Sequence, residues 1–298
     1  MSKRTWALVA ATLVSIIYGV TFTIAKDVMP HYVEPFGFIT MRVGGSVILF
    51  WLISFFAPKE KISKEDFPRI IAAAFFGVAF NMLTFFKGLS YTSPIMGAVL
   101  MVTTPMIVLV LSAFIMKERM ENKKVIGIFL GLAGTVALIL YGKSIINATN
   151  AMLGNLLVFI NAVSYGFYLI IVKKLMDKYN VFTFVKWIYT FGFIMVLPFG
   201  WNEFKSVDFA TLPLDIIWKI GFVVVISTFL TYLLNLVSMR ELKPTTVAVF
   251  IYLQPLFATF FAVSLGKDDL NTVKILAAAL IFIGVYLVTQ KRVINKSS

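Results

Sequence analysis

The chain contains one apolar pattern twice, with about 150 residues between the copies. Several tyrosine, proline, lysine and glycine positions recur at this spacing: Tyr18 with Tyr165, Pro94 with Pro244, Pro105 with Pro255, Lys124 with Lys274, and Gly134 with Gly284. Internal repeats of this kind place equivalent side chains on both sides of the interface between two halves. The repeat therefore predicts two similarly folded halves with any functional site between them.

The halves are apolar enough to lie in a membrane. Of the 298 residues, 60% are hydrophobic, and the mean hydropathy is +0.92, whereas a soluble domain is about 45–50% apolar. Apolar runs of about 20 residues can cross a bilayer core, and lipid admits only helices or closed barrels. We predict an all-α integral membrane protein with ten transmembrane helices, at roughly 6–26, 35–57, 68–88, 94–116, 124–142, 152–173, 181–201, 214–238, 244–266 and 272–290.

The basic residues predict how these spans are oriented. With a cytoplasmic N-terminus, 18 Lys and Arg residues fall on the cytoplasmic side and 7 on the other, as the positive-inside rule requires. This bias explains the net charge of +13 without a nucleic-acid partner. Because each half has an odd number of spans, residues 1–143 and 152–298 should form two inverted five-helix repeats. We expect both termini in the cytoplasm and the protein in a bacterial inner membrane.

The composition limits the available chemistry. The chain has no cysteine and a single histidine, His31, so thiolate chemistry is excluded and a histidine metal site would depend on one residue. We expect no metal, no cofactor and no catalytic residue, because no set of catalytic side chains occurs at membrane depth. An intramembrane enzyme is therefore the weaker alternative. A channel-like facilitative pore is another, although neither rings of like charge nor a filter motif is visible.

Two prolines interrupt equivalent spans in the two halves. Pro105 and Pro255 lie about midway along the fourth and ninth spans. A proline inside a helix lacks an N–H donor and clashes with the carbonyl four residues earlier, here Met101 and Ile251. Broken helices at matching positions indicate a midplane transport site and candidate gating elements. The alternative is a pair of static kinks, which membrane helices tolerate.

Polar and aromatic side chains at similar depths are candidates for lining a substrate cavity. They are Tyr18, Asn81, Phe85, Thr104, Asn161, Tyr165, Tyr232, Asn235, Tyr252 and Gln254. An amide in lipid is costly unless it is hydrogen-bonded, so the amide side chains should face the bundle. Bonds between helices, worth about 0.6–2 kcal/mol each, are the alternative role for any single one of them.

Charged residues at membrane depth are rare in this sequence. Arg42 lies about seven residues into the second span, whereas all 14 acidic residues lie at or beyond the ends of spans. Proton-coupled carriers usually place a titratable group within the membrane. We therefore expect a site of neutral hydroxyls, amides and aromatic faces, with Arg42 as its one charge, and gradient-driven flux rather than tight proton coupling.

The fifth span carries closely spaced small residues. Gly127 and Gly131 form a GxxxG motif, with Gly134 nearby. Small residues let two helix backbones approach closely. We expect this face to pack within the monomer; a homodimer interface is the alternative.

Further motifs give the chain a family resemblance. They are Gly88-Leu89-Ser90-Tyr91-Thr92-Ser93-Pro94, Lys117-Glu118-Arg119 and Gly127…Gly131…Gly134 in the first half, and Gln254-Pro255 and Lys267-Asp268-Asp269 in the second. With these motifs the chain resembles the drug/metabolite transporter superfamily, specifically its ten-helix EamA-type family. The resemblance implies a secondary transporter, an exporter or facilitator, of small metabolites such as amino acids, in contact with the lipid bilayer.

Overall fold

All regular elements among the described residues are helices. The structure is a computed structural model that describes residues 2–29, 31–58, 60–91, 97, 100–118, 120–141, 150–264 and 271–290. Eight segments of these residues are long and apolar enough to span a membrane, and the apolar helix Thr104–Ile115 is shorter. The predicted all-α, membrane-spanning fold is therefore confirmed. The first part of the predicted fourth span lies outside the described residues.

The helices follow the predicted spans closely. In the first half they are α1 (Lys3–Val28), α2 (Pro35–Ser54), η1 (Lys64–Asp66), α3 (Phe67–Ala74), η2 (Phe75–Ala79), α4 (Phe80–Tyr91), α6 (Thr104–Ile115) and α7 (Asn122–Tyr141). In the second half they are α8 (Ala151–Met176), α9 (Val181–Lys205), α10 (Leu214–Phe222), η3 (Val223–Leu230), α11 (Thr231–Glu241), α12 (Pro244–Val249), η4 (Phe250–Tyr252), α13 (Leu253–Ser264) and α14 (Thr272–Thr289). The third, eighth and ninth spans thus each consist of several consecutive helical segments of different types.

Local sequence signals explain where several helices begin. Ser2 caps α1 by accepting a hydrogen bond from the Thr5 amide, and Asn180 and Asn271 cap α9 and α14 in the same manner. A capping side chain satisfies one of the amide groups that a helix leaves free at its start. Pro244 stands in the first turn of α12, where a missing N–H costs no hydrogen bond.

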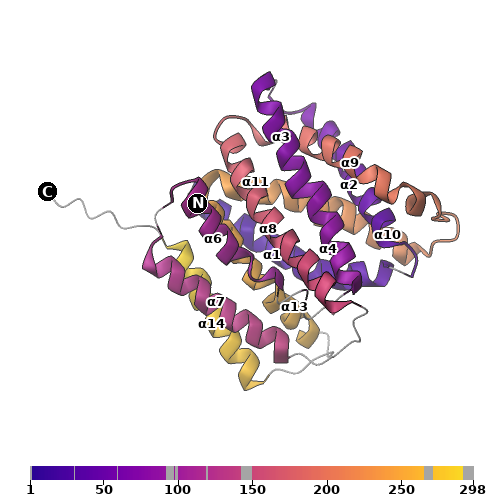
Figure 1. The fold of residues 1–298 in the computed structure, drawn as a ribbon. Helices are drawn as coiled ribbons and strands as arrows, with labels where there is room; N and C mark the ends of the chain where they lie inside the picture. The colour runs from indigo at the N-terminus through magenta and orange to yellow at the C-terminus, as the bar shows by residue number, and fades with distance from the viewer. Residues whose placement is uncertain are drawn as a thin grey trace.

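The core of the molecule is the interface between the two halves. Helix α2 packs along α9, and α7 packs along α14, at two ends of the bundle (Figure 1). Between these pairs, α1 packs on α11 and α13, and α8 packs on α4 and α6. If each helix is replaced by its counterpart in the other half, every one of these helix pairs becomes another pair named here or the same pair again. The two halves are therefore paired symmetrically, and equivalent helices face each other.

Glycines allow α7 and α14 to touch through their backbones. A Cβ atom added at Gly284 would lie 2.5 Å from the Gly127 carbonyl oxygen, and one at Gly134 would lie 2.7 Å from the Ala277 carbonyl oxygen. A Cβ at Gly131 would lie 2.4 Å from the Tyr252 ring. The prediction that the GxxxG face packs within the monomer is thus confirmed.

Both described ends of the chain lie on one side of the bundle. Arg4 Nη2 there donates a 2.5 Å hydrogen bond to the carbonyl oxygen of Thr289. We call this side the terminal face and the other side the opposite face. Because every span crosses the bundle, the connections that follow α2, α6, α8 and α11 also lie on the terminal face.

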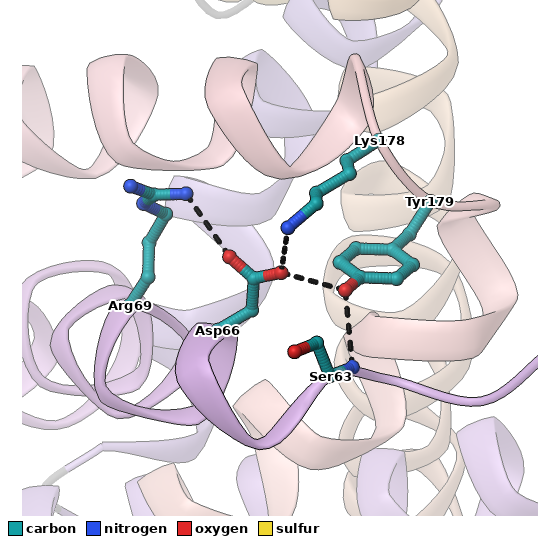
Figure 2. A network of polar contacts seen from close by, with 5 residues as sticks. All are labelled: Ser63, Asp66, Arg69, Lys178 and Tyr179. Carbon is teal, nitrogen blue, oxygen red and sulfur yellow. Dashed lines mark hydrogen bonds and ion pairs between the residues drawn. The ribbon is translucent and has the colours of Figure 1, made fainter.

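On the terminal face, the Asp66 carboxylate ties the third span to the connection after α8 (Figure 2). It accepts hydrogen bonds from Lys178 Nζ at 2.5 Å and the Tyr179 hydroxyl at 2.6 Å, and Arg69 Nη1 lies 3.2 Å away. The Tyr179 hydroxyl accepts in turn from the Ser63 amide at 3.1 Å. The bonds from Lys178 and Tyr179 outweigh desolvation and hold the pKa of Asp66 below its usual value. The ionised carboxylate therefore joins the two halves.

On the opposite face, a related network has a lysine at its centre instead of a carboxylate. Asp215 and Lys219 of the second half stand within one residue of the positions equivalent to Asp66 and Arg69 of the first. Lys219 Nζ lies 2.9 Å from an Asp27 carboxylate oxygen and 3.3 Å from one of Asp215. Among the described residues, ion pairs thus connect the two halves on both faces of the bundle.

Candidate functional site

A small polar cavity lies between the halves, about midway along the spans. Its walls come from α1, α8 and α11, at the centre of the bundle (Figure 1), and from α12, η4 and α13. The lining residues are Ala11, Val14, Ser15, Tyr18, Tyr165, Asn235, Val247, Phe250, Ile251 and Gln254. Its volume is about 20 Å³, which is room for about one water molecule.

Four of the predicted cavity residues meet here. They are Tyr18 and its repeat counterpart Tyr165, together with Asn235 and Gln254. Asn235 Nδ2 donates a 3.4 Å hydrogen bond to the Tyr165 hydroxyl. Among the described residues, none that lines the cavity is charged. Hydroxyl and amide groups can both donate and accept hydrogen bonds, so this cavity suits a polar ligand.

Ser15 is a cavity residue that the sequence analysis did not select. Its hydroxyl donates a 2.8 Å hydrogen bond to the Phe250 carbonyl oxygen and a 3.1 Å bond to the carbonyl oxygen of Ala11. Phe250 lies in the 3₁₀ turn that interrupts the ninth span. The signal for Ser15 was its position three residues before Tyr18, which places both on one face of a helix.

Both prolines mark interruptions, and the breaks lie in the turn that precedes each proline. Pro105 stands in the first turn of α6, and the Thr104 hydroxyl donates a 2.6 Å hydrogen bond to the Met101 carbonyl oxygen. Pro255 is the third residue of α13, directly after the 3₁₀ turn η4. The side-chain hydroxyls of Thr104 and Ser15 thus bind carbonyl groups at the two breaks.

A cluster of buried tyrosines from the second half extends from the cavity to a contact with the first half at Gly77. The ring centroids of Tyr165 and Tyr168 are 5.9 Å apart, those of Tyr168 and Tyr232 6.2 Å, and those of Tyr189 and Tyr232 4.9 Å. The Tyr232 hydroxyl donates a 2.7 Å hydrogen bond to the Gly77 carbonyl oxygen. The predicted residue Tyr232 is therefore adjacent to the cavity but bonded to the opposite half.

Two π-helical segments occupy equivalent places in the halves, η2 in the third span and η3 in the eighth. Such segments release carbonyl groups from the regular helical ladder and often occur at functional sites. In η2, the Phe76 carbonyl accepts from Ser164 of α8 at 2.7 Å. In η3, the Ser227 hydroxyl accepts from Thr21 of α1 at 2.9 Å. Hydroxyls of one half thus bind the irregular segment of the other.

Arg42 is a buried cation close to η3. Its side chain is 8% exposed; Nε donates a 3.1 Å hydrogen bond to Thr228 Oγ1, and the guanidinium carbon lies 5.9 Å from the centre of the Phe86 ring. Among the residues described by the structure, no carboxylate lies within ion-pair distance of Arg42. Thr231 links this region to the cavity through a 3.5 Å hydrogen bond to the Tyr18 hydroxyl. The guanidinium therefore retains donors for an anion.

The remaining predicted residues lie outside the cavity lining. Asn81 and Asn161 bond reciprocally: Asn161 Nδ2 lies 2.6 Å from the Asn81 carbonyl oxygen, and Asn81 Nδ2 lies 3.4 Å from that of Asn161. Phe85 stacks edge to face on Phe86, with centroids 5.3 Å apart. Tyr252 is fully buried over Gly131. In this conformation the two asparagines hold α4 against α8.

Within the described part of the chain, no group of three or more histidines and carboxylates is placed to hold a metal ion. The arrangement instead offers neutral hydrogen-bonding groups and one arginine between two symmetric halves. Such groups can bind a small polar molecule reversibly without changing it covalently.

Comparisons with known proteins agree with this geometry. The chain is 26% identical to an uncharacterized transporter of Archaeoglobus fulgidus over 289 residues, covering 97% of this chain and all of the relative. It is 27% identical to the uncharacterized transporter YoaV of Bacillus subtilis over 280 residues, covering 93% of this chain and 94% of that protein. A solved crystal structure superposes with a TM-score of 0.76 at 17% identity, covering 96% of this chain and 98% of the other, and so shares its fold.

The model of the EamA-like transporter family matches the chain twice, over residues 5–140 and 152–290. Together the two matches cover nearly all of the sequence. The chain therefore belongs to the EamA-like transporter family and is a multi-pass membrane transporter.

Proposed function

We propose that the protein is a secondary carrier for small carboxylate-bearing metabolites such as amino acids. It works as an exporter or facilitator, with alternating access around the cavity between its halves. The observation that carries this proposal is the cavity itself, which both halves line through the repeat-equivalent residues Tyr18 and Tyr165. Its neutral donors and acceptors match the polar groups of an amino acid, and its position at the interface lets relative movement of the halves expose it to either side.

The small volume favours a carrier over a channel-like pore. A cavity of about 20 Å³ is smaller than any amino acid, so a substrate enters only when the walls separate. A conducting pore needs a continuous path with a filter or a ring of charges, whereas the described walls of this cavity are uncharged. A pore remains the second candidate, and the kinetic test below distinguishes the two.

In this proposal, Arg42 carries the positive charge that pairs with the substrate carboxylate. It is buried against Thr228, about two helical turns along the eighth span from the cavity residue Asn235. Its guanidinium retains donors, which bind carboxylates in a forked geometry. We assign it to the substrate carboxylate in the state in which the cavity opens towards the opposite face. The amides of Asn235 and Gln254 then bind the remaining polar groups.

The proposed orientation of the protein in the membrane follows from the distribution of its basic residues. The terminal face holds the larger number of Lys and Arg residues and is therefore assigned to the cytoplasm, in a bacterial inner membrane. The acidic residues all lie near the ends of spans, so the flux follows the gradient of the metabolite without a stoichiometric proton.

Counterflow in proteoliposomes tests this function. Vesicles loaded with a mixture of unlabelled amino acids should accumulate the labelled substrate transiently and saturably, and it should be recovered unchanged. Asn235→Ala and Gln254→Ala should reduce this exchange strongly, whereas Leu214→Ala, at a position 81% exposed, should leave it intact. Flux that never saturates would indicate a pore, and chemically altered substrate would indicate an enzyme.

A further inference from the structure

A second, larger cavity opens on the terminal face. Its volume is about 410 Å³, within the range of small-molecule sites. Both halves line it, with residues from the connection between α6 and α7, from the last turns of α8 and from the start of α12. The lining residues are Met116, Lys117, Glu118, Glu121, Lys173, Lys243 and Pro244.

One wall of this cavity already binds a carboxylate, that of Glu118. Lys124 Nζ lies 2.9 Å from it, Lys243 Nζ lies 3.2 Å from it, and the Thr245 hydroxyl donates a 2.9 Å hydrogen bond. Burial would raise the pKa of Glu118, but the bonds from Lys124 and Thr245 and the charge of Lys243 outweigh it and lower the pKa. These three donors therefore form a carboxylate receptor, filled by a side chain of the protein.

The backbone before Glu118 holds it in this place. Lys117 adopts a positive φ of 53°, which is uncommon for a residue other than glycine. This turn lets the Glu118 amide donate a 3.1 Å hydrogen bond to the Ser112 carbonyl oxygen. The strained turn directs the carboxylate from the first half towards Lys243 and Thr245 of the second.

The charge of the cavity favours an additional anion. Lys117, Lys173 and Lys243 line it, and Lys124 reaches Glu118 from α7, against the carboxylates of Glu118 and Glu121. Lys173 Nζ also lies 3.3 Å from an Asp177 carboxylate oxygen, and with this residue included the four lysines still outnumber the three acidic residues. Lys243 has a side chain that is 58% exposed, so its ammonium is accessible to a solute that enters from the terminal face.

This second cavity lies between the central cavity and the terminal surface. On α8, Tyr165 lines the central cavity and Lys173 lines the second, about 12 Å further along the helix. On α12, Val247 lines the central cavity, and Pro244, about 4.5 Å along the helix, lines the second cavity. A solute that leaves the central cavity towards the terminal face therefore passes these lysines.

We propose that the second cavity is a binding site for the carboxylate of the transported metabolite, and that Glu118 occupies its donors while the site is empty. The proposal rests on the proposed function, because it assigns to this site the substrate of the same carrier. An arriving carboxylate pairs with Lys243 and Thr245, while Glu118 keeps its bond to Lys124. This exchange breaks the contact of Glu118 with the second half and so removes one of the two ionic links that the described residues form between the halves on the terminal face.

Thiol labelling tests the site without requiring transport. The chain has no cysteine, so Met116→Cys places one thiol in the cavity. Met120→Cys, at a position 57% exposed and outside the lining, is the matched control. An anionic methanethiosulfonate should modify Met116→Cys about tenfold faster than a cationic one after correction by the control, and Lys243→Gln should remove most of this preference.

Ligand protection tests the chemistry of recognition. Butyrate and 2-aminobutyrate should slow labelling of Met116→Cys at constant ionic strength, whereas butylammonium should not. Adding Glu118→Gln, which keeps the size of the side chain but removes the competing charge, should lower the butyrate concentration needed by about tenfold. Equal protection by butylammonium, or no effect of Glu118→Gln, would overturn the proposal.

Two further comparisons distinguish this proposal from a lipid-binding cavity and from a failure of the proposed function. In phosphatidylcholine vesicles butyrate should still protect; protection by added phosphatidylglycerol in place of butyrate would assign the cavity to a lipid phosphate and overturn the proposal. Loss of counterflow with butyrate protection intact would count against the proposed function alone. Normal counterflow without any charge preference at Met116→Cys would count against this site alone.

Discussion

At the scale of single residues, hydroxyl side chains lower the free-energy cost of interrupting a membrane helix. Ser15 and Thr104 each bind a carbonyl oxygen at a helix break. A buried carbonyl left without a donor costs about 1–3 kcal/mol, so one hydroxyl offsets much of that cost. Because Ser15 comes from the other half, the broken ninth span depends on the interface. The break can therefore respond to movement between the halves.

Arg42 should determine the affinity for the substrate carboxylate. Replacing it with glutamine removes the charge, and hydrogen bonds to charged groups are worth about 1.5–3 kcal/mol. We expect Arg42→Gln to raise the KM of counterflow at least about tenfold, with a smaller effect on the maximal rate. The measurement is initial exchange rate against substrate concentration in proteoliposomes.

Lys186→Gln is the control for that measurement. Lys186 is also a cation within a span, but its Nζ lies 4.6 Å from the centre of the Trp51 ring, and Lys186 is not among the residues that line the cavity. It should change KM little. An unaltered KM in Arg42→Gln would remove Arg42 from the substrate site.

Asp66 should stabilise the protein in a pH-dependent manner. Its pKa is lowered in the folded state, so its contribution is complete above the pKa of an unfolded aspartate, about 3.9. That contribution is lost as the pH falls through the folded-state pKa. Asp66→Asn should lower the unfolding temperature in detergent at pH 7, and the difference from the natural chain should shrink on acidification. A difference that is the same at pH 7 and pH 3 would show that the charge is not responsible.

At the scale of helices, the sequence predicted the interruptions that proline causes but not those that other residues permit. Pro105 and Pro255 identified the fourth and ninth spans. The π-helical segments Phe75–Ala79 and Val223–Leu230 contain no proline. In the first segment, the Phe76 and Gly77 carbonyl groups accept hydrogen bonds from Ser164 and Tyr232, which come from distant parts of the chain. Such partners are invisible in a local pattern, so these segments could not be predicted from it.

The contact between α7 and α14 should tolerate no side chain at Gly284. A Cβ there would meet the Gly127 carbonyl oxygen at 2.5 Å and the Gly131 amide nitrogen at 2.6 Å. These are backbone atoms, which cannot move aside without separating the helices. We expect Gly284→Ala to destabilise the protein by about 1–3 kcal/mol, measured as a lower unfolding temperature in detergent.

Gly221→Ala provides the matched control for this substitution. No atom lies within 4 Å of a Cβ added there, and alanine is favoured over glycine inside a helix by up to about 1 kcal/mol. This variant should be neutral or slightly stabilised. A neutral Gly284→Ala would show that α7 and α14 are not in backbone contact.

At the scale of the whole molecule, the repeat predicted the relation between halves better than it predicted the site. Equivalent positions such as Tyr18 and Tyr165 do meet at one cavity, because the pairing of helices is symmetric. Asn81 and Asn161, in contrast, bond to each other's backbone. An amide in a span signals only that it needs a partner, and whether the partner is a helix or a ligand depends on side-chain directions that the sequence does not contain.

The inverted arrangement of the halves predicts opposite accessibility for two equivalent loop positions. Lys61 follows α2, and Ala210, which lies 149 residues later, follows α9; both are exposed. If the terminal face is cytoplasmic, a membrane-impermeant maleimide should label Ala210→Cys in intact cells, and Lys61→Cys only after the membrane is permeabilised. The absence of natural cysteines makes each label specific. Labelling of both variants from outside would contradict inverted repeats, and the reverse order would place the terminal face outside the cell.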